Sequence, residues 1–388
     1  MIKKYIYLAG LAVAMMFCSC VNSDVRVYDD GVLEMNSLMG CNIEASFESM
    51  GYEPVFIELE TSDESLLPNN SHVACATDSD AFIIGQNRIY RFAIDGSFKN
   101  MVGSIGHGPM EHSQIHCISF NEKDSRVYIY DGGRRMLLWT MDNRPLKQVN
   151  LVTDGYISMA YALPDGYWAE ERNSIDGKVS YGIVWFDADG RQTARKELFS
   201  FHDKEAASYY TAPIVKQISD DCYFYYDAFS CAGYEITGHN VNKVVTIDYG
   251  DFGAEREKLN DMAYREQNRD KFSEVLDFNY DGNTIVLLTV KGKTFKASIV
   301  DMASGYSLFC HNINNPRRGG VEIWNGSKQY IWPSYFKNGT MYGLIETSEI
   351  DHKILENKGV AIRPDADSNP SLVIISPIVT TIINPQNQ

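Results

Sequence analysis

Residues 89–143 decide the fold; they read IYRFAIDGSFKNMVGSIGHGPMEHSQIHCISFNEKDSRVYIYDGGRRMLLWTMDN. Apolar residues alternate in short runs, and the first and last runs end in the turns Asp95-Gly96 and Asp142-Asn143. Such alternation is typical of β-strands, and Asp, Asn and Gly tolerate the positive φ angles of hairpin turns. A glycine-rich loop over residues 103–111 separates two sets of runs. The stretch therefore predicts one β-unit, a connector and a second copy of the unit.

The same signal recurs along the chain, which makes repetition the main organising feature. An apolar run ends in an Asp-containing turn at residues 92–96, 139–143, 185–190, 245–250 and 299–305. Short strands between such turns predict a sandwich, a barrel or a propeller. The chain from Pro54 to Thr380 is too long for one sandwich, and propeller blades of about 40–50 residues correspond to roughly six to eight blades. We predict an all-β, six-bladed β-propeller of four-stranded antiparallel blades, whose inner strands begin near Val73, Ile115, Tyr156, Ile214, Val275 and Gly320.

Two segments depart from the strand pattern. Residues 254–278 have helical spacing at Leu259, Met262 and Ala263, and again at Phe272, Val275 and Leu276. This predicts a helical insertion between blades 4 and 5 that covers a strand edge, or alternatively binds a partner. Residues 20–53 are polar and weakly patterned, and we expect a tether there, with the propeller over residues 54–388.

The first 19 residues have the features of a lipoprotein signal peptide. Lys3 and Lys4 precede an apolar stretch, residues 5–17, that is too short to span a bilayer. Phe17-Cys18-Ser19-Cys20 then resembles the bacterial motif in which a cysteine after small residues is lipidated and becomes the new N-terminus. We expect lipidation at Cys20 and a lipid-anchored protein of the cell envelope, at the outer membrane; the alternative is an ordinary cleaved signal peptide.

The net charge limits the possible partners, and the cysteine content limits the possible disulfides. The formal charge is −16, and loss of the leader with its two lysines makes it −18, so nucleic acid is excluded as a partner. Six cysteines remain beyond Cys20, without a CxxC pair: Cys41, Cys75, Cys117, Cys222, Cys231 and Cys310. Export permits disulfides, and Cys222 with Cys231 is a candidate hairpin bridge. We prefer the interpretation that these cysteines are buried free thiols.

Three motifs resemble the six-bladed β-propeller lipoproteins of Bacteroidetes, which are TolB-like and related to NHL-repeat propellers. Residues 56–61, with Ser65-Leu66-Leu67 behind them, are similar to the family's first strand, and residues 369–374 are similar to its closing strand. Residues 105–111 resemble its Gly-x-Gly-Pro-Gly-Glu-Tyr connector, with Met110 in place of a glycine. The resemblance implies that a strand from each end of the chain closes the ring.

The glycine-rich connector is the first candidate binding site. It lacks the lysine of a P-loop and the strand-to-helix context of a dinucleotide site. Gly106, Gly108 and Pro109 suit a rigid connector, and Glu111 either caps the turn or faces a ligand. We name Gly106, Gly108, Pro109 and Glu111 as candidate binding residues and favour the structural role.

Other candidates for chemistry are weaker. His107, His112 and His116 lack helical metal-ligand spacing, and the acidic triplets 78–80, 187–190 and 365–367 do not continue as calcium loops. There is no G-x-S-x-G elbow. Aromatic residues suit either sugar stacking or packing between blades, and we expect packing for Trp168, Trp185, Trp324, Trp332 and residues 223–226.

We therefore predict a membrane-anchored, non-catalytic binding or scaffolding lipoprotein with a protein or glycan partner. No metal, cofactor or catalytic residue is predicted. The alternative is a propeller enzyme of the lyase or lactonase type with a metal in the axial channel. The predicted inner-strand starts are mostly apolar, which favours binding over such an enzyme.

Overall fold

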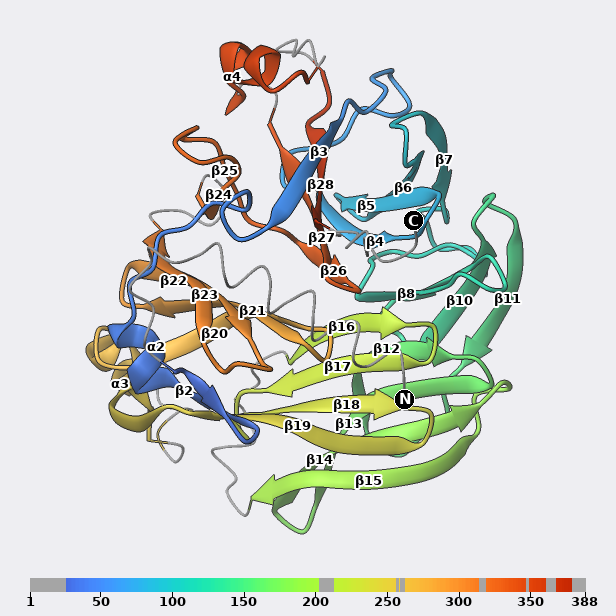
Figure 1. Cartoon of the computed structure of the whole chain (residues 1–388). Coiled ribbons are helices and arrows are strands. Elements are labelled where there is room, and N and C mark those ends of the chain that lie inside the picture. The colour runs from blue at the N-terminus through green and yellow to red at the C-terminus, as the bar shows by residue number, and fades with distance from the viewer. Residues whose placement is uncertain are drawn as a thin grey trace, which may run out of the picture.

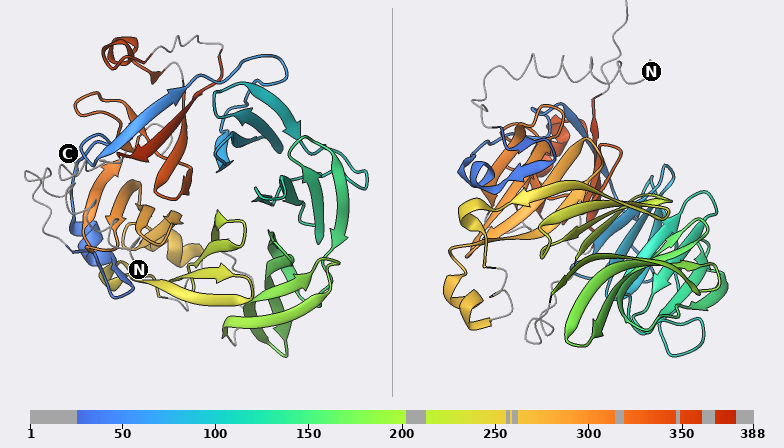
Figure 2. Two further views of the ribbon diagram at one scale, coloured as in Figure 1. Left: turned by 45° about the vertical axis from the view of Figure 1, so that its right-hand side comes forward. Right: turned by 90° about the horizontal axis from the view of Figure 1, so that it is seen from below.

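The sheets stand around a ring, as the left view of Figure 2 shows, and six of them are its blades. This computed structural model describes residues 26–201, 213–255, 258, 262–313, 319–346, 349–360 and 368–378. The six-bladed, four-stranded antiparallel propeller predicted from the sequence is confirmed. Within these residues no helix is long and apolar enough to cross a membrane.

Blades 1 to 3 run in chain order from the inner strand to the outer strand (Figure 1). Blade 1 consists of β4 (His72–Ala76), β5 (Asp80–Gly85), β6 (Arg88–Ala93) and β7 (Phe98–Val102). Blade 2 consists of β8 (Cys117–Asn121), β9 (Arg126–Tyr130), β10 (Arg135–Thr140) and β11 (Pro145–Asn150). Blade 3 consists of β12 (Tyr156–Leu163), β13 (Gly166–Ile175), β14 (Lys178–Asp187) and β15 (Gln192–Phe201).

Blades 4 to 6 complete the ring. Blade 4 consists of β16 (Ile214–Ser219), β17 (Cys222–Asp227), β18 (Ala232–Thr237) and β19 (Asn240–Asp248). Blade 5 consists of β20 (Ser273–Tyr280), β21 (Thr284–Lys291), β22 (Thr294–Asp301) and β23 (Ser307–Ile313). Blade 6 consists of β26 (Tyr335–Lys337), β27 (Thr340–Ile345), β28 (Ser371–Pro377) and β3 (Tyr52–Ile57).

Both ends of the chain build blade 6, as the resemblance implied. β28 pairs antiparallel with β3, placing Val373 opposite Phe56. Because a closed ring leaves few free sheet edges, this pairing protects the blade from edge-to-edge association.

Four of the five copies of the recurring Asp turn occupy the same position within a blade. At residues 92–96, 139–143, 185–190 and 299–305 it lies between the third and fourth strands of a blade. Gly96 and Asn143 have φ of 91° and 61° there, which explains the preference for Gly and Asn. The copy at 245–250 instead ends β19 and continues into the short 3-10 helix η2 (Gly250–Phe252).

The aromatic side chains mostly form the core, as expected. Trp168 stacks on Tyr161 and meets the edge of Tyr223 from the next blade. Trp185 and Trp324 are buried, as are all residues from 223 to 226, whereas Trp332 is half-buried. Packing between blades therefore explains most of this aromatic content.

The prediction of a tether over residues 20–53 is wrong for residues 26–53. They form β1 (Tyr28–Asp29), β2 (Val32–Glu34), helix α2 (Met35–Gly40) and the start of β3. β2 pairs parallel with β19, so the strand extends blade 4 outward. Leu33 and Leu38 are buried, and this burial outweighs the polar composition around them. Cys20 lies outside the described residues.

The prediction of a helical insertion over residues 254–278 is wrong for the residues from Ser273 onward, which form a strand. Helix α3 (Met262–Asn268) is present, and Leu259 lies outside the described residues. β20 begins at Ser273, and its pairing with β21 shifts register between Val275 and Asp277. Such a bulge inserts one residue into the strand, so the apolar spacing imitates that of a helix.

The inner strand predicted near Gly320 is also misplaced. Gly320 precedes a two-stranded sheet of β24 (Val321–Glu322) and β25 (Tyr330–Ile331), and the inner strand β26 begins only at Tyr335. A Cβ at Gly320 would lie 2.3 Å from the Ile331 carbonyl oxygen, so the glycine permits close backbone approach rather than starting a blade. The short helix α4 (His352–Asn357) follows β27. The other five inner strands begin within about two residues of their predicted positions.

The six cysteines beyond Cys20 are free thiols, and Cys222 and Cys231 are the two that are not fully buried. Cys222 lies opposite Thr237 at one end of the β17–β18 hairpin, whereas Cys231 precedes β18 at the other end. A hairpin disulfide between them is therefore ruled out by the register.

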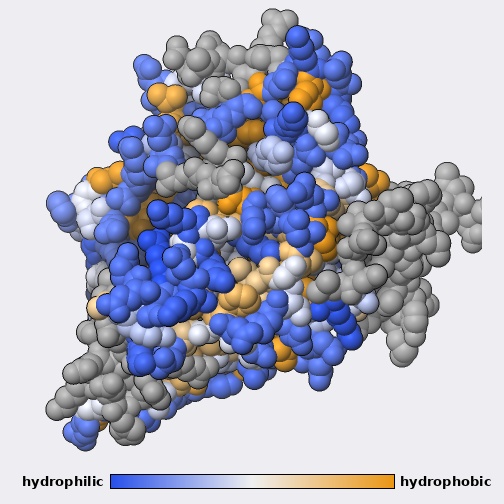
Figure 3. Space-filling model, turned by 90° about the vertical axis from the view of Figure 1, so that its left-hand side faces the viewer, coloured by the Kyte–Doolittle hydropathy of each residue, from blue (hydrophilic) through white to orange (hydrophobic). Residues whose placement is uncertain are grey.

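Figure 3 shows that the surface on the side of α2 is largely hydrophilic with small apolar patches.

Candidate functional site

The glycine-rich connector joins β7 of blade 1 to β8 of blade 2. The Glu111 carboxylate accepts a hydrogen bond of 2.8 Å from the Gly108 amide. A Cβ at Gly106 would lie 2.0 Å from the same carboxylate oxygen, so the loop closes tightly around Glu111. Pro109 is exposed beside them. The structure brings Gly106, Gly108 and Glu111 together in the arrangement of a capped turn, and a ligand at this loop stays a prediction.

The three histidines near this loop point to different partners. His112 is buried, with Nε2 3.0 Å from the Asn87 carbonyl oxygen. His116 packs against Gly132 and the ring of Tyr130, and His107 is exposed. In the described part of the chain, no three His, Cys, Asp or Glu residues are grouped as metal ligands.

The acidic triplets that lie in the described ranges form turns and ion pairs. Asp187 Oδ1 accepts backbone hydrogen bonds from Asp189 and Arg191, both at 2.9 Å. Asp80 pairs with Arg91. The triplet at 365–367 lies outside the described residues.

Inner strands of different blades are linked across the ring. Gln217 of β16 donates to the Phe120 carbonyl at 2.6 Å and accepts from the Phe120 amide at 2.9 Å. Asp220 accepts backbone hydrogen bonds from Glu122 and Lys123, at the turn after β8. Blade 3 separates blades 4 and 2 in the chain order, so these bonds draw their inner strands together near the axis.

A third link ends at the same turn of blade 2. Lys337 of blade 6 forms an ion pair with the Glu122 carboxylate. The links therefore occupy the end of the ring where the first and second strands of blades 2, 4 and 6 turn. This is space that an axial metal site at that end would need.

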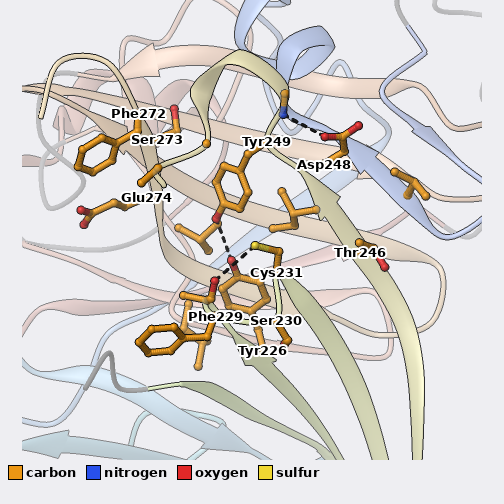
Figure 4. A pocket seen from close by; sticks show the side chains of 18 residues that line it. Tyr226, Phe229, Ser230, Cys231, Thr246, Asp248, Tyr249, Phe272, Ser273 and Glu274 are labelled. Carbon is orange, nitrogen blue, oxygen red and sulfur yellow. Dashed lines mark hydrogen bonds between the residues drawn. The ribbon is translucent and has the colours of Figure 1, made fainter. Parts of the chain in front are cut away.

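A cavity of about 670 Å³ lies at the opposite end of blade 4, between blades 4 and 5 (Figure 4). It is bounded by the end of β17, the turn before β18, the end of β19 and the start of β20. Its volume is in the range of small-molecule sites. The longer connection through η2 and α3 separates the two blades here, which leaves room between the strand ends.

The cavity walls are aromatic and apolar, with polar groups at several points. The aromatic lining residues are Tyr226, Phe229, Tyr249 and Phe272. The polar lining residues are Ser230, Cys231, Thr246, Asp248, Ser273 and Glu274. The described lining contains two carboxylates and no Lys, Arg or His. Such a surface disfavours phosphate and carboxylate ligands.

Tyr226 and Tyr249 share a hydrogen bond of 2.8 Å between their hydroxyl groups. Burial raises the pKa of both phenols, and the neighbouring tyrosine adds to this effect for Tyr226. Both hydroxyls therefore stay protonated at neutral pH. They suit hydrogen bonding to a neutral ligand better than proton transfer, which needs a pKa near the working pH.

Two carboxylates at the cavity have different surroundings. Glu274 pairs with Arg265 of α3 at 2.8 Å, which offsets its charge. Asp248 is exposed, and its Oδ1 accepts a hydrogen bond of 3.0 Å from the Gly250 amide. Its second oxygen leaves acceptor capacity for a ligand donor.

Ser273 offers an additional polar atom. The residue is 5% exposed, and its hydroxyl has no hydrogen-bond partner in the described structure. An unpartnered buried hydroxyl costs free energy, so ordered water or a ligand group at this position would be stabilising.

The sequence did not predict this site. Its residues come from strand ends that are separated in sequence, and none of them forms a motif. The nearest signals were the aromatic run 223–226, the atypical Asp turn at 245–250 and the insertion that follows it.

The fold and cavity together define a six-bladed propeller with linked inner strands and a lateral pocket between two blades. The chain belongs to the DUF4934 family, a domain of unknown function, which matches residues 31–376. The match begins at Gly31, within the segment that packs beside blade 4. No curated protein matches the chain.

Solved structures from Bacteroides are similar to this chain. One is a protein of Bacteroides fragilis assigned as exported, at 15% identity and a TM-score of 0.61, covering 89% of this chain and 98% of that protein. Another is a DUF4221 member from Bacteroides vulgatus, at 8% identity and a TM-score of 0.47, covering 84% and 96%. At such identities the first similarity supports the propeller fold alone.

Proposed function

We propose that this protein is an exported, lipid-anchored binding protein whose pocket between blades 4 and 5 takes a small neutral saccharide. The observation that carries the proposal is the pocket lining, which combines aromatic rings with hydroxyl and carboxylate groups and contains no cationic side chain. Aromatic faces pack against sugar rings, while carboxylate and hydroxyl oxygens accept hydrogen bonds from sugar hydroxyls.

A non-catalytic role agrees with the chemistry of the pocket. The two tyrosines stay protonated because burial raises each pKa, and the Glu274 carboxylate is paired with Arg265. No described feature favours the alternative of a lyase or lactonase with an axial metal, since cross-ring hydrogen bonds occupy one end of the axis.

The location rests on the leader and on the relatives. Lys3, Lys4, the short apolar stretch and Cys20 resemble a lipoprotein signal. The similar protein of Bacteroides fragilis is assigned as exported. We further propose that the protein is located at the outer membrane. We also propose that it is related to TolB-like and NHL-repeat propellers.

Titration calorimetry with neutral mono- and disaccharides tests the ligand, with glucuronate and galacturonate as charged counterparts. Asp248→Asn keeps an oxygen for the Gly250 amide but removes the charge, and should weaken binding by about tenfold because a hydrogen bond to a charged group is lost. Asp95→Asn is the matched control, since Asp95 accepts from the amide of Ser97 two residues ahead in a turn outside the pocket. The proposal fails if no neutral saccharide binds at millimolar concentration, or if both variants weaken binding equally.

The anchor has its own test. Cys20→Ala, made in the full chain with its leader, should move the protein from the membrane fraction to the soluble envelope fraction, because a protein without its acyl chains loses stable anchoring. Cys222→Ala is the control and should stay membrane-bound. Continued membrane association of Cys20→Ala would contradict the lipid anchor and leave the saccharide test unaffected.

A further inference from the structure

The N-terminal segment is docked on the ring from Val27 onward. The Val27 amide donates to the Gly305 carbonyl of blade 5 at 2.8 Å, and the Val27 carbonyl accepts from the Glu34 amide at 2.8 Å. The Thr246 amide of β19 donates to the Gly31 carbonyl at 2.7 Å. Val27 is buried in the same place. The segment therefore belongs to the folded ring and does not lengthen the tether before it.

The residues that follow are held at the same edge of the ring. In helix α2 the Asn36 side chain donates to the Asp251 carboxylate at 3.2 Å and accepts from the Asp251 amide at 3.0 Å. After α2, Ile43 and Cys310 of β23 exchange two backbone hydrogen bonds of 2.7 and 3.0 Å. The segment is thus bound to blade 4, to η2 and to blade 5, and releasing it would break all of these contacts.

The tether between the anchor and the docked segment is short. Five residues separate Cys20 from Arg26, the first described residue. The six residue steps from Cys20 to Arg26 span at most about 20 Å, even in a fully extended chain. A globular chain of this length is roughly 50 Å across. The tether is therefore too short to pass around the molecule.

We infer that the outer edge of blades 4 and 5, where β1, β2 and α2 pack, faces the bilayer. The inference rests on the lipid anchor at Cys20, which is part of the proposed function. Figures 1 and 2 place β2 and α2 across the ring from β10 and β11 of blade 2. Blade 2 therefore points away from the membrane, and the lipid headgroup layer is the partner of the docked edge.

The surface of this edge suits contact with headgroups better than insertion among acyl chains. The side of α2 is largely hydrophilic (Figure 3). Near the anchor, Asp29, Asp30 and Glu34 are exposed acids, and Arg26 pairs with Asp29 at 2.8 Å. Because acidic groups are not attracted to anionic lipids, the tether rather than charge holds this edge at the membrane.

The pocket between blades 4 and 5 lies close to the anchored edge. Val27 lies beside Glu34, and Glu34 lies opposite Asp248 in the parallel pairing of β2 with β19. Since neighbouring strands are about 4.8 Å apart, Asp248 is about 10 Å from Val27. Val32 and Asp248 both line the pocket. The pocket is thus on the membrane-proximal side of the ring.

Energy transfer to labelled lipid tests this orientation. The lipidated protein, in a Cys222→Ser/Cys231→Ser background, carries a donor dye at Asp29→Cys on the docked edge or at Arg144→Cys in the exposed turn between β10 and β11. The other described cysteines are buried, so the dye reacts at the introduced one. Each protein is placed in phosphatidylcholine vesicles that contain an acceptor lipid. Transfer from position 29 should be about twofold higher or more, because position 144 lies across the ring.

A lengthened tether is the matched control. A flexible linker of about 20 glycine and serine residues, inserted between Ser23 and Asp24, has an r.m.s. length of about 25 Å and should bring the two transfer values together. Equal transfer from both positions in the unextended protein, with vesicle binding retained, overturns the orientation and leaves the anchor intact. Loss of vesicle binding by the unextended protein overturns the anchor and the orientation together. Saccharide titration in solution depends on neither result.

Discussion

Asn369 joins the two ends of the chain at the point where the ring closes. The residue is 1% exposed, and its Nδ2 donates to the carbonyl oxygens of Glu60 and Ser65. Its Oδ1 accepts from the Leu67 amide at 2.7 Å, and its own amide donates to Thr61 Oγ1. One side chain therefore binds three backbone groups of the segment after β3.

Asn369→Ala should lower the free energy of unfolding by about 2–4 kcal/mol, because the Leu67 amide and the Ser65 carbonyl lose this partner while remaining buried. Urea unfolding followed by circular dichroism measures the change. Asn283→Ala, at an exposed turn position, is the matched control and should stay within about 0.5 kcal/mol of wild type. An Asn369 variant as stable as the control would show that water replaces the amide at no cost.

Residue roles were predictable where a local motif fixed them. The segment around Asn369 was singled out through its resemblance to a closing strand, and its pairing with β3 is confirmed. Glu111 was left between capping and ligand binding, and its bond to Gly108 shows the capping contact. Ser273 carried no signal and Asp248 was marked only as a turn residue, because their surroundings depend on chain segments that the sequence does not place beside them.

At the scale of elements, hydrophobic alternation located strands well until a local irregularity interfered. The bulge beside Val275 gave a strand the spacing of a helix, and Gly320 opened a hairpin instead of a blade. The N-terminal segment was misjudged for a different reason. Its few apolar residues, such as Leu33, are buried by β19 and its neighbours, so their effect depends on tertiary contacts that composition does not reveal.

At the scale of the molecule, the number of blades was predictable because four blades repeat the same Asp turn between their third and fourth strands, and the chain length fits six such units. The pocket was not predictable, since it lies between blades 4 and 5, where η2 and α3 stand in the connection between the two blades. The links across the ring were also invisible in the sequence. Gln217 has no motif, yet it binds both backbone groups of Phe120 and so couples two blades that are not consecutive.

The coupling between blades 2 and 4 should contribute to stability. Gln217→Leu should lower the free energy of unfolding by about 1–3 kcal/mol, because leucine occupies similar space but leaves the Phe120 amide and carbonyl unpaired. Asp220→Ala removes the second link between the same blades, so the double variant should lose less than the sum of the single losses. Urea unfolding of the four proteins measures this interaction energy. Gln114→Leu, at an exposed position of the connector, controls for the change of side chain. Strictly additive losses would mean that each link acts alone and that the ring is not held as a unit across its axis.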